Sequence, residues 1–200
     1  EVAASELTKR VGDFHVVVRE NQPRATRVLP PSVEVIQNRV ARGFGANHNA
    51  TFRATGMTGN EWFVVCNPDI QTDQDQIARL LDGADRDEAD IAVPFLLTAP
   101  QGEFDHNVRP FPRFPTLARS FCSGGTAARY PPSSISSIRH PDWASGAFLA
   151  IRAQLYADIG GFDERYFMYM EDVDLCLRAA RLGAPVHFYP DIRIVHAASR

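Results

Sequence analysis

The strongest constraint on the fold is a series of short apolar runs rich in β-branched or aromatic residues. These runs occupy residues 14–18, 33–36, 62–66 and 91–97, the last with Pro94 in its middle. Stretches that suit helices alternate with them, at residues 3–11, 46–54 and 74–81. Continuous apolar runs are typical of strands buried on both faces. The alternation therefore predicts an α/β fold with a mostly parallel sheet and helices on both faces.

A long loop then interrupts this pattern. Residues 100–141 hold 7 of the 14 prolines. A loop of this length inside a domain is usually functional or poorly ordered. A lid over a polar ligand and a surface excursion without function explain it equally well. The residues that would suit a lid are Arg109, Phe111, Arg113, Phe114, Arg119 and Tyr130.

Regular structure returns after the loop. The sequence predicts a strand at 143–151, a helix that ends near 159, a helix at 170–182, and strands at 186–189 and 192–195. No internal repeat is visible. At 200 residues the chain has the size of one domain.

Composition excludes several classes of protein. Hydrophobic residues make up 44% of the chain and charged residues 22%, as in soluble globular proteins. No apolar run is long enough to span a bilayer, and no basic leader opens the chain, so we expect no export. The net charge of -3 argues against a nucleic-acid partner.

The cysteines argue against a zinc site. Cys66, Cys122 and Cys176 are widely spaced and form no Cys-x-x-Cys pair. We expect all three to be buried small side chains in a reducing cytoplasm.

A polar motif, Asn67-Pro68-Asp69, directly follows the apolar run at residues 62–66. Ligands of open parallel sheets collect at the carboxyl ends of the strands. A carboxylate there can hold a divalent cation, which in turn neutralises a diphosphate. The same tripeptide also fits a simple chain-reversing turn, because all three residue types favour turns.

Three acidic residues, Glu171, Asp172 and Asp174, open the helix predicted at 170–182. Acidic residues in a first turn complement the helix dipole, which explains most such clusters. Three acidic residues within four positions, directly after the aromatic-rich stretch 166–170, are more than helix capping requires. A carboxylate that faces a cleft can accept a proton from a hydroxyl nucleophile. The helix N-terminus would keep such a base ionised and make it weaker.

Two weaker signals accompany these motifs. His196 follows the strand predicted at 192–195, where a histidine is either structural or a ligand, and its partner as a ligand would be Asp69. The stretch from Gly43 to Asn49 places two glycines before a helix, a setting that favours phosphate near backbone amides. It is not a Walker motif, and it lacks the third glycine of the dinucleotide fingerprint.

Taken in order, these motifs resemble those of family 2 glycosyltransferases of the GT-A type, close to the bacterial rhamnosyltransferase-like branch. The resemblance covers about residues 14–196. Its strongest stretches lie at residues 142–148 and 160–178, which include Gly-Gly-Phe-Asp-Glu and Glu-Asp-Val-Asp-Leu. Tyr189-Pro190-Asp191 and Val195-His196 close it.

The resemblance implies roles for individual residues. Asp69 would bind Mg²⁺ or Mn²⁺ in a form of the Asp-x-Asp motif in which Asn67 replaces the first acid, and His196 would complete the metal site. Asp172 would be the base of a single, inverting displacement on a nucleotide-sugar. The acceptor side would include Trp143, Ser145, Gly146 and Glu171. The donor side would include Glu20, Asn21, Gly43, Phe44, Asn47, Asn67 and Asp69.

The resemblance also implies partners and a location. The donor would be linked to dTDP or UDP, with rhamnose as the first choice of sugar. The acceptor would be a glycan or lipid-linked hydroxyl in bacterial polysaccharide synthesis. The protein would be cytoplasmic, with peripheral association at the inner face of the membrane as an option. The chain would divide into a nucleotide-sugar-binding half at 1–99, a loop or lid at 100–141, and an acceptor and catalytic half at 142–200.

Departures from the family pattern keep alternatives open. The usual Val-Asp-Asn-x-Ser signature appears as Val-Arg-Glu-Asn-Gln-Pro at 18–23, with Glu20 replacing the acid that contacts the base. Relative to the family pattern, we expect these 200 residues to lack its first strand, before its first helix, and its tail beyond the final histidine. We expect the missing central strand to leave a gap between its neighbours. A non-catalytic relative that binds nucleotide-sugar or glycan, and a nucleotidyltransferase, are the alternative functions.

Overall fold

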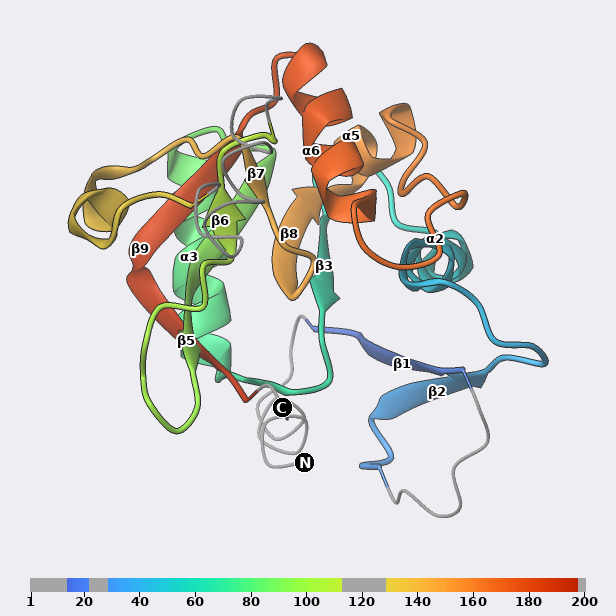
Figure 1. The fold of residues 1–200 in the computed structure, drawn as a ribbon. Helices are drawn as coiled ribbons and strands as arrows, with labels where there is room; N and C mark the ends of the chain where they lie inside the picture. Colours follow the sequence, from blue (N-terminus) through green and yellow to red (C-terminus); the bar gives the residue numbers. More distant parts are fainter. Residues whose placement is uncertain (1–13, 22–28, 113–128, 198–200) are drawn as a thin grey trace.

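A five-stranded sheet forms the body of the protein (Figure 1). The computed structural model describes residues 14–21, 29–112 and 129–197. The strands follow the order β3 (Trp62–Cys66), β8 (Phe148–Arg152), β5 (Ile91–Thr98), β9 (Val186–His196) and β4 (Ile70–Gln71).

The sheet is mixed rather than mostly parallel. β5 and β9 pair in parallel, whereas β8 is antiparallel to both of its neighbours and β4 is antiparallel to β9. β3, β5 and β9 therefore share one direction, and the expectation of a parallel sheet holds for these three alone. The predicted α/β class is confirmed. An apolar run does not reveal its own direction, so the sequence did not show that β8 runs the other way.

Helices cover both faces of the sheet (Figure 1). Alternate residues of β8 show the two layers. Leu149 and Ile151 belong to one core with α5 and α6, whereas Phe148 and Ala150 belong to another with α3. The predicted covering of both faces is therefore confirmed. The helices are α2 (Phe44–Thr55), α3 (Gln74–Arg86), α5 (Ala153–Asp158) and α6 (Glu171–Arg181).

A separate two-stranded sheet lies to one side of this body (Figure 1). β1 (Val16–Glu20) and β2 (Val33–Gln37) pair in parallel with each other. Within the described ranges neither strand pairs with β3, which forms an edge of the main sheet. Among the described strands, β1 and β2 are therefore joined to no other sheet, and the expected gap stays a prediction.

The loop at 100–141 contains regular structure where it is described. β6 (Val108–Arg109) pairs with β7 (Trp143–Ala144), so the strand predicted at 143–151 is instead two strands, β7 and β8. A 3-10 helix covers Pro132–Ser137. Several predictions fall outside the described residues: Arg113, Phe114, Arg119, Cys122 and the helix at 3–11.

β9 is one strand where the sequence predicts two. Its register against β5 shifts between Pro94 and Phe95, which pair with Tyr189 and Arg193 respectively. Residues 190–192 of β9 therefore form a bulge that does not pair with β5. In the sequence this bulge looks like a gap between two separate strands.

Two further expectations concern cysteines and membranes. Cys176 is buried as expected, and burial raises the pKa of its thiol to about 12. Cys66 is exposed, contrary to expectation, because it is the last residue of an edge strand. Among the described residues, no helix is both long enough and apolar enough to cross a membrane.

Candidate active site

One end of the main sheet gathers Asp69, Asp105 and His196. Asp69 stands in a turn after β3, where the Ile70 N–H donates to the Asn67 carbonyl at 3.2 Å. β4 follows at once and pairs with the end of β9, which sets Ile70 opposite His196. His196 Nε2 then lies 3.3 Å from Asp69 Oδ1, and His196 Nδ1 lies 2.6 Å from Asp105 Oδ2. The Asn67-Pro68-Asp69 motif thus forms a turn, and this turn places Asp69 beside His196.

This arrangement fits a divalent cation. If Nδ1 donates to Asp105, the Nε2 lone pair of a neutral His196 faces Asp69 Oδ1, which is buried and has no hydrogen-bond partner among the described residues. Two ligand atoms with bonds of about 2.1 Å to one octahedral ion lie about 3 Å apart. No described group of three or more His, Cys, Asp or Glu residues has metal-binding geometry. Water and phosphate oxygens would therefore supply the other ligands.

Asp172 lies in the first turn of α6, beside the β7–β8 connection. Its Oδ2 accepts a hydrogen bond from the Gly146 N–H at 3.3 Å, and its Oδ1 accepts one from the Val173 N–H at 2.8 Å. Burial raises the pKa of Asp172 above that of an exposed aspartate, while these N–H groups and the charge of Arg109 oppose the shift. Burial therefore outweighs the expected weakening of the base by the helix N-terminus.

Glu171 is buried beside Asp172. Only 6% of the residue is exposed, and its Oε2 has no hydrogen-bond partner in the described part of the chain. Burial raises the pKa of Glu171, and the charge of Asp172 raises it further. A buried carboxyl group without a partner is costly. Glu171 is therefore suited to a hydrogen bond with a ligand at this end of α6.

Arg109 of β6 interacts electrostatically with both Asp105 and Asp172. The β6–β7 register pairs Arg109 with Trp143, and its guanidinium stands 5.6 Å from the centre of the Trp143 ring. Burial, and then the charge of Arg129, lower the pKa of Arg109. The negative charges of Asp105 and Asp172 raise the pKa of Arg109. A half-buried cation in this position suits an anionic ligand.

The start of α2 packs against the same region. A side chain at Gly43 would collide with Phe167, because its Cβ would lie 2.4 Å from the Phe167 carbonyl oxygen. The Phe44 N–H donates to that oxygen at 3.0 Å, so this amide is not free to bind a phosphate. The Phe44 ring lies over Gly146, where an added Cβ would be 2.8 Å away. Gly43 and Gly146 thus permit close packing between the predicted donor and acceptor sides.

Three asparagines form a cluster between the two-stranded sheet and α2. Asn38 Nδ2 donates to Asn21 Oδ1 at 2.9 Å and to Asn47 Oδ1 at 2.7 Å. Asn47 Nδ2 also donates to Asn21 Oδ1, at 3.1 Å. Arg19 donates to Asn38 Oδ1 at 3.0 Å, and the Glu20 carbonyl accepts from the Asn38 N–H at 2.9 Å. The predicted donor residues Glu20, Asn21 and Asn47 therefore lie together.

The Gly-Gly-Phe-Asp-Glu motif is anchored by Asn49. The Asn49 Oδ1 accepts hydrogen bonds from the Phe162 N–H at 2.9 Å and the Tyr156 hydroxyl at 2.6 Å. Its Nδ2 donates to the Phe162 carbonyl at 2.8 Å. Gly161 has φ of +68°, and an added Cβ would lie 2.3 Å from Asn49 Oδ1. This motif therefore ties α2 to the segment that leads into α6.

Sequence reasoning missed some of these residues. Asp105 belongs to no motif, and it reaches the site because its N–H donates to the Leu96 carbonyl at 3.0 Å across a hairpin. Asn38 begins the glycine-rich stretch 38–49 that supported the resemblance, but no role in the site was assigned to it. Two predicted residues make backbone contacts here: the Asn67 N–H donates to the Ala147 carbonyl at 2.9 Å, and the Ser145 N–H donates to the Asn107 carbonyl at 2.8 Å.

Comparison with known proteins decides the family. The sequence profile of "Glycosyl transferase family 2" matches residues 15–146, which is more than half of the chain. The chain belongs to glycosyl transferase family 2. The match covers the Asp69 turn, Asp105, Arg109 and Gly146 of the site.

Relatives of this family 2 chain include two bacterial rhamnosyltransferases. The N-acetylglucosaminyl-diphospho-decaprenol L-rhamnosyltransferase of Mycobacterium tuberculosis is 31% identical over 192 residues, covering 88% of this chain and 62% of the relative. The rhamnosyltransferase WbbL of Escherichia coli is 29% identical over 161 residues, covering 78% and 61% respectively. The chain thus spans about three fifths of the length of these relatives.

Solved structures show the fold of GT-A glycosyltransferases. GalNAc-T7 with UDP, GalNAc and Mn²⁺ has a TM-score of 0.60 at 12% identity, covering 83% of this chain and 32% of GalNAc-T7. The mannosyltransferase PcManGT from Pyrobaculum calidifontis with GDP-Man and Mn²⁺ has a TM-score of 0.55 at 16% identity, covering 93% and 48% respectively. The predicted GT-A fold is confirmed.

Proposed function

We propose that this family 2 chain is the core of an inverting glycosyltransferase that depends on a divalent cation. It moves a sugar, with rhamnose as the first choice, from a dTDP- or UDP-linked donor to a glycan or lipid-linked acceptor in bacterial polysaccharide synthesis. The observation that carries the proposal is Asp172, a half-buried carboxylate bound to the Gly146 N–H, at the same site as the pair of Asp69 and His196. The names of the two bacterial relatives support the choice of sugar.

Asp172 is the proposed base. It removes the proton from the acceptor hydroxyl while that oxygen forms a bond to the anomeric carbon of the donor. The bond between that carbon and the diphosphate oxygen breaks, and its electron pair leaves with the nucleoside diphosphate. One displacement inverts the configuration. A positioned general base contributes about 10²- to 10⁴-fold in rate.

Asp69 and His196 are the proposed ligands of Mg²⁺ or Mn²⁺. A cation bound there would neutralise the charge that develops on the departing diphosphate. Asp105 fixes His196 through Nδ1, so that Nε2 faces Asp69. Both solved neighbours contain Mn²⁺, which supports a divalent cation. Arg109 would contact the diphosphate, which gives the loop at 100–141 the function of a lid.

The remaining site residues divide between the two substrates. Trp143, Ser145, Gly146 and Glu171 would contact the acceptor around the first turn of α6. The asparagine cluster and Glu20 would contact the nucleoside, and Gly43 and Phe44 would join the two sides. A name among the relatives, which specifies a diphospho-decaprenol compound, supports a lipid-linked acceptor. A cytoplasmic enzyme at the inner face of the membrane would meet both substrates.

A transfer assay across a panel of nucleotide-sugars with Mn²⁺ tests the proposal. We expect release of nucleoside diphosphate that depends on both the acceptor and the cation, and a product of inverted configuration. Release of pyrophosphate would identify a nucleotidyltransferase instead. Donor binding without turnover, with every acceptor tested, would identify a non-catalytic relative.

A further inference from the structure

The segment before α6 exposes an unbroken run of large apolar side chains, which we call the apolar strip: Tyr166, Phe167, Met168, Tyr169 and Met170. Their exposed fractions lie between 37% and 78%. In the described chain, only three other large hydrophobic residues are exposed, and they are scattered: Val35, Val40 and Leu182. Scattered exposed apolar residues are ordinary, but a contiguous group marks an interaction surface.

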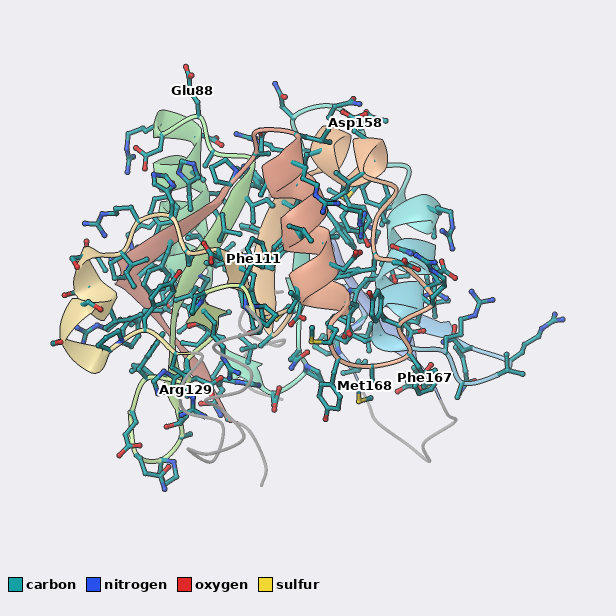
Figure 2. The ribbon with its side chains drawn as sticks, turned by 45° about the horizontal axis from the view of Figure 1, so that its top comes forward. Glu88, Phe111, Arg129, Asp158, Phe167 and Met168 are labelled. Atoms are coloured by element: carbon teal, nitrogen blue, oxygen red, sulfur yellow. The ribbon has the colours of Figure 1, made fainter. Side chains whose placement is uncertain are left out.

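The backbone of the apolar strip is constrained by its conformation and by hydrogen bonds. Tyr169 and Met170 both have positive φ, 69° and 72°, which is uncommon for residues other than glycine. The strip is tied at one end by the Phe44 N–H, which donates to the Phe167 carbonyl at 3.0 Å. At the other end the Asp174 N–H donates to the Met170 carbonyl at 3.0 Å. Figure 2 shows Phe167 and Met168 near each other at the edge of the molecule.

Positive charge adjoins the apolar strip. The segment between β2 and α2 carries exposed Arg39 and Arg42, with exposed Val40 between them. It meets the strip at Gly43, which touches the Phe167 backbone. Among the described residues neither arginine forms an ion pair. Because the chain as a whole has a net charge of -3, it can approach an anionic surface favourably only through a local basic region.

We propose that the apolar strip, together with Arg39 and Arg42, docks onto an anionic phospholipid bilayer. Aromatic and methionine side chains enter the interface between headgroups and acyl chains, and the arginines contact lipid phosphates. The strip leads directly into Glu171 and Asp172, so docking sets the base close to the height of the headgroups. That last step rests on the proposed function, because it assumes a lipid-linked acceptor.

Vesicle sedimentation of the 200-residue chain tests this surface without donor or acceptor. The vesicles contain phosphatidylcholine alone or mixed with phosphatidylglycerol. We expect binding to the anionic vesicles only, weakened more than tenfold by Phe167→Ser/Met168→Ser, because two large apolar groups are lost. Arg39→Gln/Arg42→Gln should weaken binding by about fivefold per arginine and reduce its salt dependence. Leu182→Ser is the matched control, since it removes an equally exposed apolar side chain elsewhere, and it should bind as the wild type does.

Three results would overturn the proposal: no binding to either vesicle, equal losses in Leu182→Ser and the strip variant, or full binding by a folded strip variant. A loss of transfer to a water-soluble acceptor by the strip variant, with vesicle binding intact, would assign the strip to the acceptor glycan. Vesicle binding that follows the expected pattern in a chain without transferase activity would uphold the surface and refute the proposed function.

Discussion

The two parts of the site rest on different kinds of support. Asp69 and His196 lie at the ends of strands in the five-stranded sheet, and Asp172 lies in the first turn of α6, which packs on that sheet. The sheet has an apolar core on each face. The asparagine cluster stands beside a two-stranded sheet that pairs with no other described strand. Two strands alone are marginally stable. The β1–β2 sheet is instead linked to α2 by the side-chain hydrogen bonds of Asn47.

This difference separates the proposed catalytic and cation-binding residues from the proposed donor-binding residues. The apolar packing of two cores fixes the proposed base and cation ligands, so their positions tolerate little change. The asparagine cluster depends on polar contacts that are individually worth only about 0.5–1.5 kcal/mol. We therefore expect substitutions on the main sheet to abolish turnover, and those in the cluster to adjust donor affinity.

The largest effect is expected from Asp172→Asn. Transfer should fall by about 10²- to 10⁴-fold, because no other described carboxylate takes its place at Gly146. Donor affinity should stay near the wild-type value, measured by titration calorimetry beside the transfer assay. Asp174→Asn, which loses the ion pair with Arg178 but not the base, serves as the control. Equal turnover in wild type and Asp172→Asn would refute the role of the base.

A smaller effect is expected from Asp105→Asn. The variant weakens the hold on His196 Nδ1 without removing a cation ligand, so Mn²⁺ affinity should fall by about 10- to 100-fold. Mn²⁺ binding in the presence of nucleoside diphosphate, followed by electron paramagnetic resonance, measures this directly. Asp158→Asn, which affects a hydrogen bond with Gln154 of the same helix, should bind Mn²⁺ as the wild type does. Unchanged affinity in Asp105→Asn would show that His196 needs no such partner.

Features that depend on local sequence could be predicted, whereas features that depend on long-range pairing could not. β3 was predicted with its observed bounds because an apolar run is a local signal. The pairing of Asp69 with His196 came from the family resemblance, since spacing alone could not bring two such distant residues together. Asp105 could not be predicted, because no local pattern marks it. It lies beside His196 only because the chain after β5 folds back on that strand, where the Asp105 N–H donates to the Leu96 carbonyl. The direction of β8 and the antiparallel pairs it makes depend equally on long-range pairing.

The fall of kcat/KM at low pH, the acid limb of the pH–rate profile, tests the electrostatic environment of Asp172. Asp172 must be ionised to accept a proton, so kcat/KM should fall as pH drops through its pKa. Burial raises that pKa, which moves the limb above the range of an exposed aspartate. The charge of Arg109 lowers the pKa, so Arg109→Gln should move the limb to still higher pH and reduce the neutral-pH rate less than tenfold. Arg53→Gln, with its charge paired to Glu164, is the control. An acid limb that stays in place, or moves to lower pH, would contradict the electrostatic effect of Arg109 on Asp172.

The smallest effect is expected from Asn47→Ala, and it tests the comparison most directly. The variant removes the bonds of Asn47 with Asn21 and Asn38 but leaves the main sheet untouched. Since each bond contributes about 0.5–1.5 kcal/mol, donor KM should rise about 2- to 10-fold with kcat unchanged. Asn60→Ala, outside the cluster, should change neither constant. A fall in kcat equal to that of Asp172→Asn would mean that the cluster positions the reacting groups, and the two regions would then act as one unit.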